Sequence, residues 1–258
     1  MVARAATVAT NGMIGCQGVT KAFGGVIANN DITLDVHEGR ITGLIGPNGS
    51  GKTTLFNSIV GYHPVDAGSI RFRGKEISRL LVPQIARMGL VRTFQQTRIY
   101  SKMNCVDNML ISLPHRREGY RTMFTTYPRE AYERAEELLE FVGLYQKRLL
   151  ISGDLSFGQQ KLLEFAMALM SEPEVLLLDE PTAGVNPTLI NGLIDRLKRA
   201  NEDMGITLFV IEHNMRVIMN LAEHIYCLAN GKLLAGGPPD QIQRDQRVIE
   251  AYLGGRSH

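Results

Sequence analysis

A phosphate-binding loop between a strand and a helix restricts what this chain can fold into. Ile41 to Ile45 is an apolar, strand-length run, and Gly46-Pro47-Asn48-Gly49-Ser50-Gly51-Lys52-Thr53 follows it directly. This segment matches the pattern G-x-x-x-x-G-K-[ST] without a gap, and Thr54 to Val60 then predicts a helix. A buried strand that leads through such a loop into a helix is typical of α/β proteins with a parallel sheet.

The loop has the residue types that nucleotide phosphates require. Its glycines let the backbone turn tightly, so that consecutive N–H groups point inward at phosphate oxygens. The helix that begins near Gly51 adds its positive N-terminal end. We expect the Lys52 ammonium to reach the β- and γ-phosphates and the Thr53 hydroxyl to ligate Mg²⁺.

Two carboxylates end a second apolar run. Val175 to Leu178 predicts a buried parallel strand, and Asp179 and Glu180 follow it. Ligands bind at the carboxyl ends of such strands, so we expect Asp179 to belong to the Mg²⁺ shell and Glu180 to act as general base on an attacking water. The alternative is an acidic pair that caps the helix beginning near Pro187. The phosphate loop favours the catalytic interpretation.

Strands and helices are unevenly distributed along the chain. They alternate after residue 155, which indicates parallel βαβ units, whereas the first hundred residues predict short strands between turns. Asn230-Gly231 between two apolar runs predicts a hairpin with a type I′ turn. The expected strands are Met13 to Thr20, Asp31 to Val36, Ser69 to Arg73, Glu174 to Leu178, Ile206 to Ile211, Ile225 to Leu228 and Lys232 to Ala235, and the expected helices include Arg129 to Gly143, Ser156 to Met170 and Pro187 to Asp203.

These patterns predict an α/β fold: a P-loop ATPase core with a mostly parallel sheet, an N-terminal antiparallel β subdomain and an inserted helical subdomain. No N-K-x-D motif for reading guanine occurs, which disfavours a GTPase. We expect residues 1–12 to form a flexible tail and residues 13–258 to form one domain. Within that domain, residues 13–97 and 154–258 would build the nucleotide-binding core, and residues 98–153 the helical insert.

Composition excludes several classes of protein. The 28 Lys and Arg residues against 26 Asp and Glu residues give a net charge of +2, without the clustered basic excess of a nucleic-acid binder. Cys16, Cys105 and Cys227 are too scattered for a disulfide framework or a zinc knuckle, which fits a reducing cytosol. The sequence has no apolar run of about 18 residues, and therefore predicts no membrane span.

A further segment separates this chain from other phosphate-loop proteins. Leu155-Ser156-Phe157-Gly158-Gln159 resembles the Leu-Ser-Gly-Gly-Gln signature of ABC ATPases, with Phe157 in place of the first glycine. Ser156-x-x-Gln159 is also a capping box at the start of an apolar helix, and both interpretations can hold together. The resemblance implies a head-to-tail dimer in which the signature of each subunit closes the nucleotide site of the other.

Other marks of the ABC ATPases occur in the expected order. By this resemblance, Phe23 stacks on adenine, Gln95 joins the Mg²⁺ and water shell, and His213 contacts the γ-phosphate. Their simpler interpretations are a strand-surface aromatic, a polar residue leaving a strand, and a turn residue. Asn186 stands where the family often has Asp, which puts the cross-subunit contacts of that loop in doubt. The ATP-binding residues that the resemblance implies are Phe23, Asn48, Gly49, Ser50, Gly51, Lys52, Thr53, Thr54, Ser156, Gly158 and Gln159, the catalytic residues are Glu180, His213 and Gln95, and the Mg²⁺ ligands are Thr53, Gln95 and Asp179.

At a finer level the chain looks like the ATP-binding subunit of branched-chain amino acid importers. The segments Arg92-Thr93-Phe94-Gln95 and Ile211-Glu212-His213-Asn214-Met215, the Ala-Gly-Val-Asn-Pro stretch from Ala183, and the tail from Val248 to Gly254 carry this resemblance. It implies a second ATPase subunit, separate permease chains, an indirect solute-binding protein and a place on the cytoplasmic face of the membrane. Import of urea or amides, export of lipopolysaccharide, and a soluble ABC ATPase working on DNA or ribosomes remain as alternatives.

Overall fold

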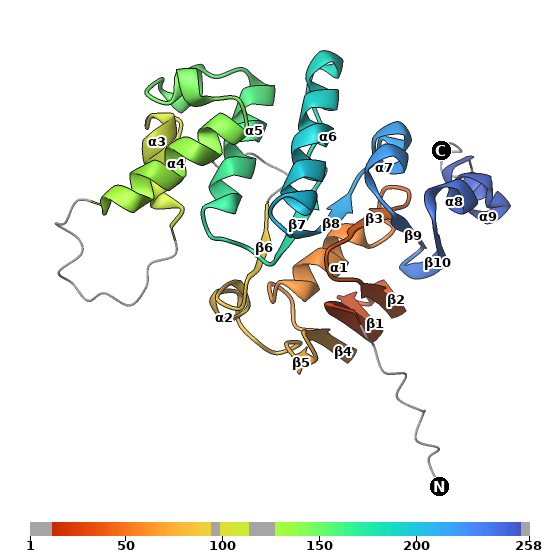
Figure 1. Ribbon diagram of the computed structural model, residues 1–258. Coiled ribbons are helices and arrows are strands. Elements are labelled where there is room, and N and C mark those ends of the chain that lie inside the picture. Colours follow the sequence, from red (N-terminus) through yellow and green to blue (C-terminus); the bar gives the residue numbers. More distant parts are fainter. Residues whose placement is uncertain (1–11, 94–98, 114–126, 254–258) are drawn as a thin grey trace, which may run out of the picture.

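Two β-sheets pack against each other around one helix, and most of the other helices pack on the far face of the larger sheet (Figure 1). The computed structural model describes residues 12–93, 99–113 and 127–253. Of the tail expected over residues 1–12, only residue 12 is among these described residues. Gln95 lies outside them.

The larger sheet is six-stranded and mostly parallel. Only its edge hairpin, β9–β10, is antiparallel. The two central turn residues of this hairpin, Asn230 and Gly231, have φ angles of 49° and 73°, as a type I′ turn requires. In spatial order the strands are β10 (Lys232–Gly237), β9 (His224–Ala229), β3 (Ile41–Ile45), β8 (Thr207–Ile211), β7 (Val175–Asp179) and β6 (Leu90–Arg92).

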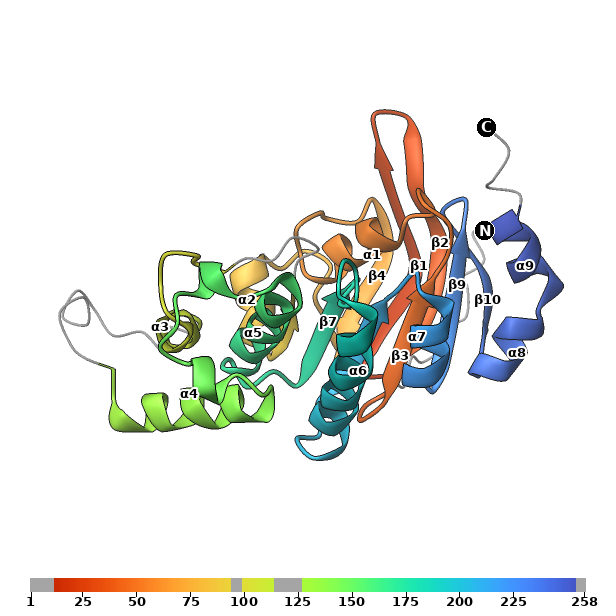
Figure 2. The ribbon, with the colours of Figure 1, turned by 90° about the horizontal axis from the view of Figure 1, so that it is seen from above.

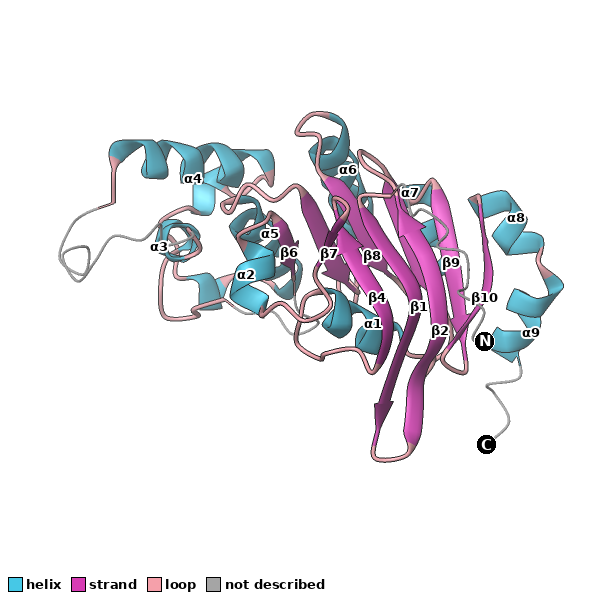
Figure 3. Cartoon of the chain, turned by 90° about the horizontal axis from the view of Figure 1, so that it is seen from below, coloured by secondary structure: helices cyan, strands magenta, loops and turns pink. Residues whose placement is uncertain are grey.

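The smaller sheet is antiparallel and comes from the N-terminal part of the chain. Strand β1 pairs with β2 on one side and with β4 on the other, and a long β1–β2 hairpin projects beyond the body of the molecule (Figure 3). The strands, in spatial order, are β2 (Val26–Val36), β1 (Ile14–Phe23), β4 (Ala67–Phe72) and β5 (Lys75–Glu76).

The helices group at distinct places around the sheets. Helix α1 lies between the two sheets, α3 and α4 lie with α5 at one end of the molecule, and α8 and α9 lie at the opposite end (Figures 1 and 2). The helices are α1 (Lys52–Ile59), α2 (Val82–Ala86), α3 (Cys105–Ile111), α4 (Arg129–Phe141), α5 (Phe157–Leu169), α6 (Pro187–Glu202), α7 (Met215–Leu221), α8 (Pro239–Arg244) and α9 (Gln246–Leu253), with 3₁₀ turns at Tyr145–Lys147 and Ser152–Asp154.

The central strands are apolar at every position because both of their faces are covered. In β7, Val175 and Leu177 pack into the core shared with α1 and the small sheet, whereas Leu176 and Leu178 pack into the core under the outer helices. Burial on both faces is the usual reason for an uninterrupted apolar run in a parallel strand. The same arrangement brings the carboxyl ends of β3, β8 and β7 side by side at one edge of the sheet.

The predicted fold class is confirmed, and most expected elements differ from the observed ones by a few residues. The range of β3 agrees at both ends. The sequence analysis missed short elements, namely β5, α2, β6, α3, α7, α8 and α9. Within residues 98–153 the described elements are helical, while the domain boundaries themselves stay a prediction. No helix in the described parts of the chain is both long and apolar enough to span a membrane.

Candidate nucleotide site

The phosphate loop leaves the carboxyl end of β3 and enters α1. Gly51, the residue before α1, has a φ of 98°, and a Cβ atom there would lie 2.2 Å from the carbonyl oxygen of Ala28. Only glycine fits this combination of positive φ and close backbone approach. No side chain caps the first turn of α1, so its N–H groups face the loop without a side-chain acceptor. Such N–H groups are what an anion at a helix N-terminus binds.

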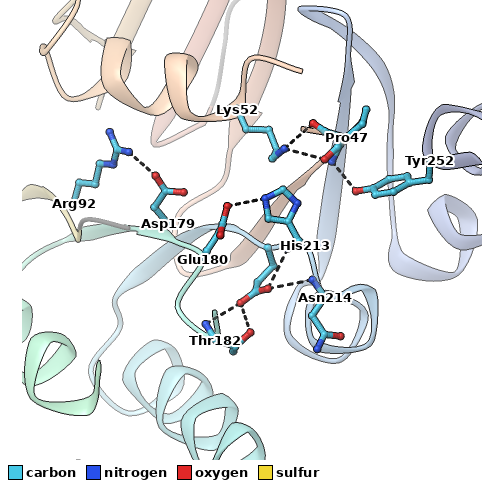
Figure 4. Close-up of polar contacts among 11 residues, drawn as sticks. Pro47, Lys52, Arg92, Asp179, Glu180, Thr182, His213, Asn214 and Tyr252 are labelled. Carbon is cyan, nitrogen blue, oxygen red and sulfur yellow. Dashed lines mark hydrogen bonds and ion pairs between the residues drawn. The ribbon is translucent and has the colours of Figure 1, made fainter. Parts of the chain in front are cut away.

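Lys52 points back into the loop that it follows (Figure 4). Its Nζ atom donates hydrogen bonds to the carbonyl oxygens of Gly46, at 2.8 Å, and Pro47, at 3.0 Å. Burial lowers the pKa of Lys52, and the nearby carboxylates of Glu180 and Asp179 oppose that shift. The ammonium group is therefore held beside the loop, facing the acidic end of β7.

Thr53 is exposed at the start of α1, and the Ser50 hydroxyl is buried without a hydrogen-bond partner. Asn48 and Gly49 are exposed at the tip of the loop, and Thr54 is partly buried one residue further into the helix. The loop and the start of α1 therefore carry three hydroxyl groups, those of Ser50, Thr53 and Thr54.

Asp179 ends β7 as a buried carboxylate with two different oxygen environments. Its Oδ2 atom accepts a hydrogen bond from the Arg92 guanidinium at 2.5 Å, and its Oδ1 atom is buried without a hydrogen-bond partner. An unpaired buried carboxylate oxygen beside the Thr53 helix fits a hard cation such as Mg²⁺, which prefers oxygen ligands. The donor types of Asp179 and Thr53 thus suit the predicted metal.

Glu180 and His213 meet across the ends of neighbouring strands. His213 Nε2 lies 2.6 Å from a carboxylate oxygen of Glu180, and Figure 4 shows the two side chains pointing toward each other. Glu180 has a φ of 52°, a left-handed backbone angle that is uncommon outside glycine. Such angles cost on the order of 1–3 kcal/mol and occur in turns, as at Asn230, as well as at active sites. The unusual angle lies at the residue that the sequence analysis assigned as base.

Phe23 lies at the end of β1, in the projecting hairpin, and its side chain is 43% exposed. His63 packs edge-on against it with the ring centroids 5.1 Å apart. Lys21 Nζ lies 5.3 Å from the centroid of the Phe23 ring. An aromatic ring that is exposed to this extent remains available for stacking on a planar base.

The signature segment forms the N-terminus of α5. Ser156 Oγ accepts a hydrogen bond from the Gln159 N–H at 3.4 Å, and Gln159 Oε1 accepts one from the Ser156 N–H at 3.1 Å, so the predicted capping box is present. Phe157 packs on Gly184, where a Cβ atom would lie 2.8 Å from its ring. In the described ranges, no hydrogen bond or ion pair joins Ser156, Gly158 or Gln159 to the phosphate loop.

The Asn186 side chain makes hydrogen bonds to a residue two positions further along the chain. Its side-chain oxygen accepts hydrogen bonds from the Thr188 N–H, at 3.1 Å, and from the Thr188 hydroxyl, at 3.0 Å. It is thereby the N-cap of α6. An Asn at this position serves the cap as well as an Asp does.

The sequence analysis gave no role to three residues that contact this site. They are Arg92 beside Asp179, Glu212 beside His213, and Tyr252, whose hydroxyl accepts a hydrogen bond from the Gly46 N–H at 2.8 Å. A carboxylate directly after an apolar strand was the available signal for Glu212, as it was for Asp179. The contacts of Arg92 and Tyr252 had no local signal, because their partners lie far along the sequence.

Two family models match parts of this chain. A family model described as ABC transporter matches residues 29–183. A second, described as Branched-chain amino acid ATP-binding cassette transporter, matches residues 232–258.

Curated proteins and solved structures resemble it over most of its length. The high-affinity branched-chain amino acid transport ATP-binding protein BraF of Pseudomonas aeruginosa is 39% identical over 92% of this chain and 96% of its own length. The corresponding LivG protein of Escherichia coli is 36% identical, covering 94% and 98%. The ADP conformation of the ATP-binding cassette MJ1267 has a TM-score of 0.84 at 32% identity, covering 94% and 98%. A dimeric cassette, MJ0796 bound to ADP and Pi, has a TM-score of 0.75 at 25% identity, covering 88% and 99%.

Proposed function

Because this chain belongs to the ABC transporter family of ATP-binding proteins, we propose that it is the ATP-hydrolysing subunit of an importer of branched-chain amino acids. The observation that carries the hydrolytic role is the contact of 2.6 Å between Glu180 and His213, beside the phosphate loop. The names of the relatives BraF and LivG, and the second family model over residues 232–258, support the solute class. They favour it over urea, amides and lipopolysaccharide.

The proposed reaction transfers the γ-phosphoryl group of ATP to water. Phe23 stacks on adenine, the N–H groups from Asn48 to Thr54 bind the phosphates, and Lys52 neutralises the β- and γ-oxygens. Glu180 takes a proton from the attacking water while the water oxygen bonds to the γ-phosphorus. The bond between the γ-phosphorus and the bridging oxygen breaks, and ADP leaves. His213 holds the Glu180 carboxylate in position and faces the γ-phosphate.

Thr53 and Asp179 would hold the Mg²⁺ ion of the nucleotide, together with Gln95. When bound, the ion neutralises charge on the phosphate oxygens. In this chain, Arg92 keeps the Asp179 carboxylate oriented toward that position through its hydrogen bond of 2.5 Å.

A second subunit completes the proposed site. Ser156, Gly158 and Gln159 of each subunit would contact the nucleotide of the other, either in a homodimer or with a related chain. The dimeric arrangement of MJ0796 supports this proposal. Permease chains would carry the solute, fed by a solute-binding protein, with the dimer bound to them at the cytoplasmic face of the membrane.

One variant tests the hydrolytic role. Glu180→Gln keeps the side-chain shape and removes the base, so we expect ATP turnover to fall by roughly 10²–10⁴ while ATP still binds. Glu202→Gln, the same change at an exposed position, is the matched control. Normal turnover by Glu180→Gln would contradict the assignment.

The solute is tested in vesicles that contain this protein and its co-purifying permease chains. ATP-dependent uptake of labelled leucine is expected, and uptake of urea is not. Uptake of urea without leucine would replace the proposed solute and leave the ATPase assignment intact.

A further inference from the structure

Glu212 is a buried carboxylate that has no part in the mechanism above. It follows directly after β8 and is 2% exposed. Its Oε1 atom accepts hydrogen bonds from the Thr182 N–H, at 2.9 Å, and the Thr182 hydroxyl, at 2.5 Å. Its Oε2 atom accepts from the backbone N–H groups of His213, at 3.1 Å, and Asn214, at 3.3 Å. Figure 4 labels the three residues that supply these donors, Thr182, His213 and Asn214.

The two oxygens of Glu212 serve two different loops. Oε1 holds the loop after β7, at the residue two positions beyond Glu180, and Oε2 holds the loop after β8, at His213 itself. The carboxylate therefore fixes the separation of the two loops that carry the Glu180–His213 pair. Glu180 adds one backbone link of its own, from its N–H to the carbonyl oxygen of Ile211 at 2.9 Å.

Only a glutamate suits this position. A buried carboxylate is costly unless donors satisfy it, and here four donors do so. A glutamine could still accept from Thr182, but its amide N–H groups would face the N–H groups of His213 and Asn214. The side chain of an aspartate is one methylene group shorter than that of glutamate, so its carboxylate would not reach both loops.

We propose that Glu212 is a positioning residue for ATP hydrolysis, whose carboxylate holds the loops after β7 and β8 at the separation at which Glu180 and His213 meet. This inference rests on the proposed hydrolytic function. Among the described residues, no hydrogen bond or ion pair joins Glu212 to the phosphate loop or to Lys52. Its loss should therefore affect the chemical step and leave nucleotide binding unchanged.

The test compares Glu212→Gln with Glu202→Gln, the same chemical change at an exposed position of α6. We expect Glu212→Gln to lower kcat about tenfold and to leave the dissociation constant of ATP within about twofold. The hydrogen bonds that this variant weakens join the loops after β7 and β8 to each other, and none of them joins the phosphate loop. Amide hydrogen exchange should become faster at His213 and Asn214. A normal kcat, or a fall in kcat matched by a similar loss of ATP affinity, would overturn the proposal.

A second variant covers the case in which Glu212→Gln does not fold. Thr182→Val removes one donor and keeps the size of the side chain, so we expect about a threefold lower kcat with unchanged ATP affinity. An unchanged kcat in Thr182→Val would then contradict the proposal. Glu180→Gln, measured in parallel, separates the two ideas. If it is inactive while both loop variants are normal, Glu212 has no positioning role and the hydrolytic function stands. If Glu180→Gln is active, the hydrolytic function itself fails.

Discussion

Arg92 and Asp179 form an ion pair of 2.5 Å in which the side chains are only 5% and 0% exposed. Arg92 lies on the edge strand β6 and also donates a hydrogen bond to Asn57 in α1. One guanidinium thus joins the end of β7 to the helix that follows the phosphate loop. A buried pair of this kind depends on both partners, because either charge alone would be left without compensation.

Replacing Arg92 tests that dependence. Arg92→Met should destabilise the protein by about 3–5 kcal/mol, the usual cost of leaving one buried charge unpaired. Arg92→Met combined with Asp179→Asn should recover part of the lost stability, because the double variant leaves no unpaired carboxylate charge at residue 179. Denaturant unfolding measures both. Arg87→Met, at an exposed position, should change stability by less than about 0.5 kcal/mol. An equally small effect at Arg92 would mean that the pair adds no stability.

Lys52→Ala should weaken nucleotide binding and abolish hydrolysis while the fold persists. The Lys52 ammonium group is held at the phosphate loop by the carbonyl oxygens of Gly46 and Pro47, where it can pair with phosphate oxygens. Calorimetric titration with ATP measures the loss, and Lys75→Ala, at an exposed position of β5, is the control. Unchanged ATP affinity in Lys52→Ala would refute the assignment.

Mixing two inactive variants tests the composite site. Lys52→Ala and Ser156→Arg subunits together can form one intact site per heterodimer, with the loop from the second and the signature from the first. We expect recovery of up to about half of wild-type activity per heterodimer, rising with protein concentration because dimers must form. Strong coupling between the two sites, or a native partner that is a related chain, would lower the recovery.

Ser156→Arg alone separates the cross-subunit role from the capping role. Loss of the observed cap should cost about 1 kcal/mol, seen as a lower melting temperature. Loss of the cross-subunit contact should also remove ATPase activity from the folded fraction. A lower melting temperature with near-normal activity would leave Ser156 with the cap alone.

Tyr252→Phe removes one hydroxyl and keeps the ring. Burial raises the pKa of Tyr252 to about 12, and its hydroxyl oxygen accepts a hydrogen bond from the Gly46 N–H. We expect a loss of about 1 kcal/mol in the free energy of unfolding and faster amide exchange at Gly46. Tyr132→Phe, where the ring is 41% exposed, should change neither. Slow exchange at Gly46 in Tyr252→Phe would show that the bond does not protect the loop.

The parts of the site that could be predicted have local causes. An apolar run buried on both faces predicted β3 and β7, and the residues directly after each strand lie at the ligand-binding edge. The Asn230-Gly231 turn likewise depends only on the φ angles of two adjacent residues.

The parts that were missed depend on distant partners or short lengths. Strand β6 has only 3 residues, too few for an alternation of apolar and polar residues to be recognised. Arg92 is 87 residues from Asp179, and Tyr252 is 206 residues from Gly46, so neither contact leaves a local pattern. The roles of Phe23, Gln95 and the signature residues remain predictions, since they concern a nucleotide and a second subunit.

The strand order also determines how late in synthesis the neighbours of the phosphate loop's strand are made. Strand β3 carries the phosphate loop and emerges early, but its two neighbours in the sheet are β8 and β9, which are made last among the parallel strands. A ribosome-bound chain that ends before Thr207 has the phosphate loop without either flanking strand and without His213. In the order of synthesis, the loop proposed to bind phosphate is therefore made long before His213, the proposed partner of Glu180.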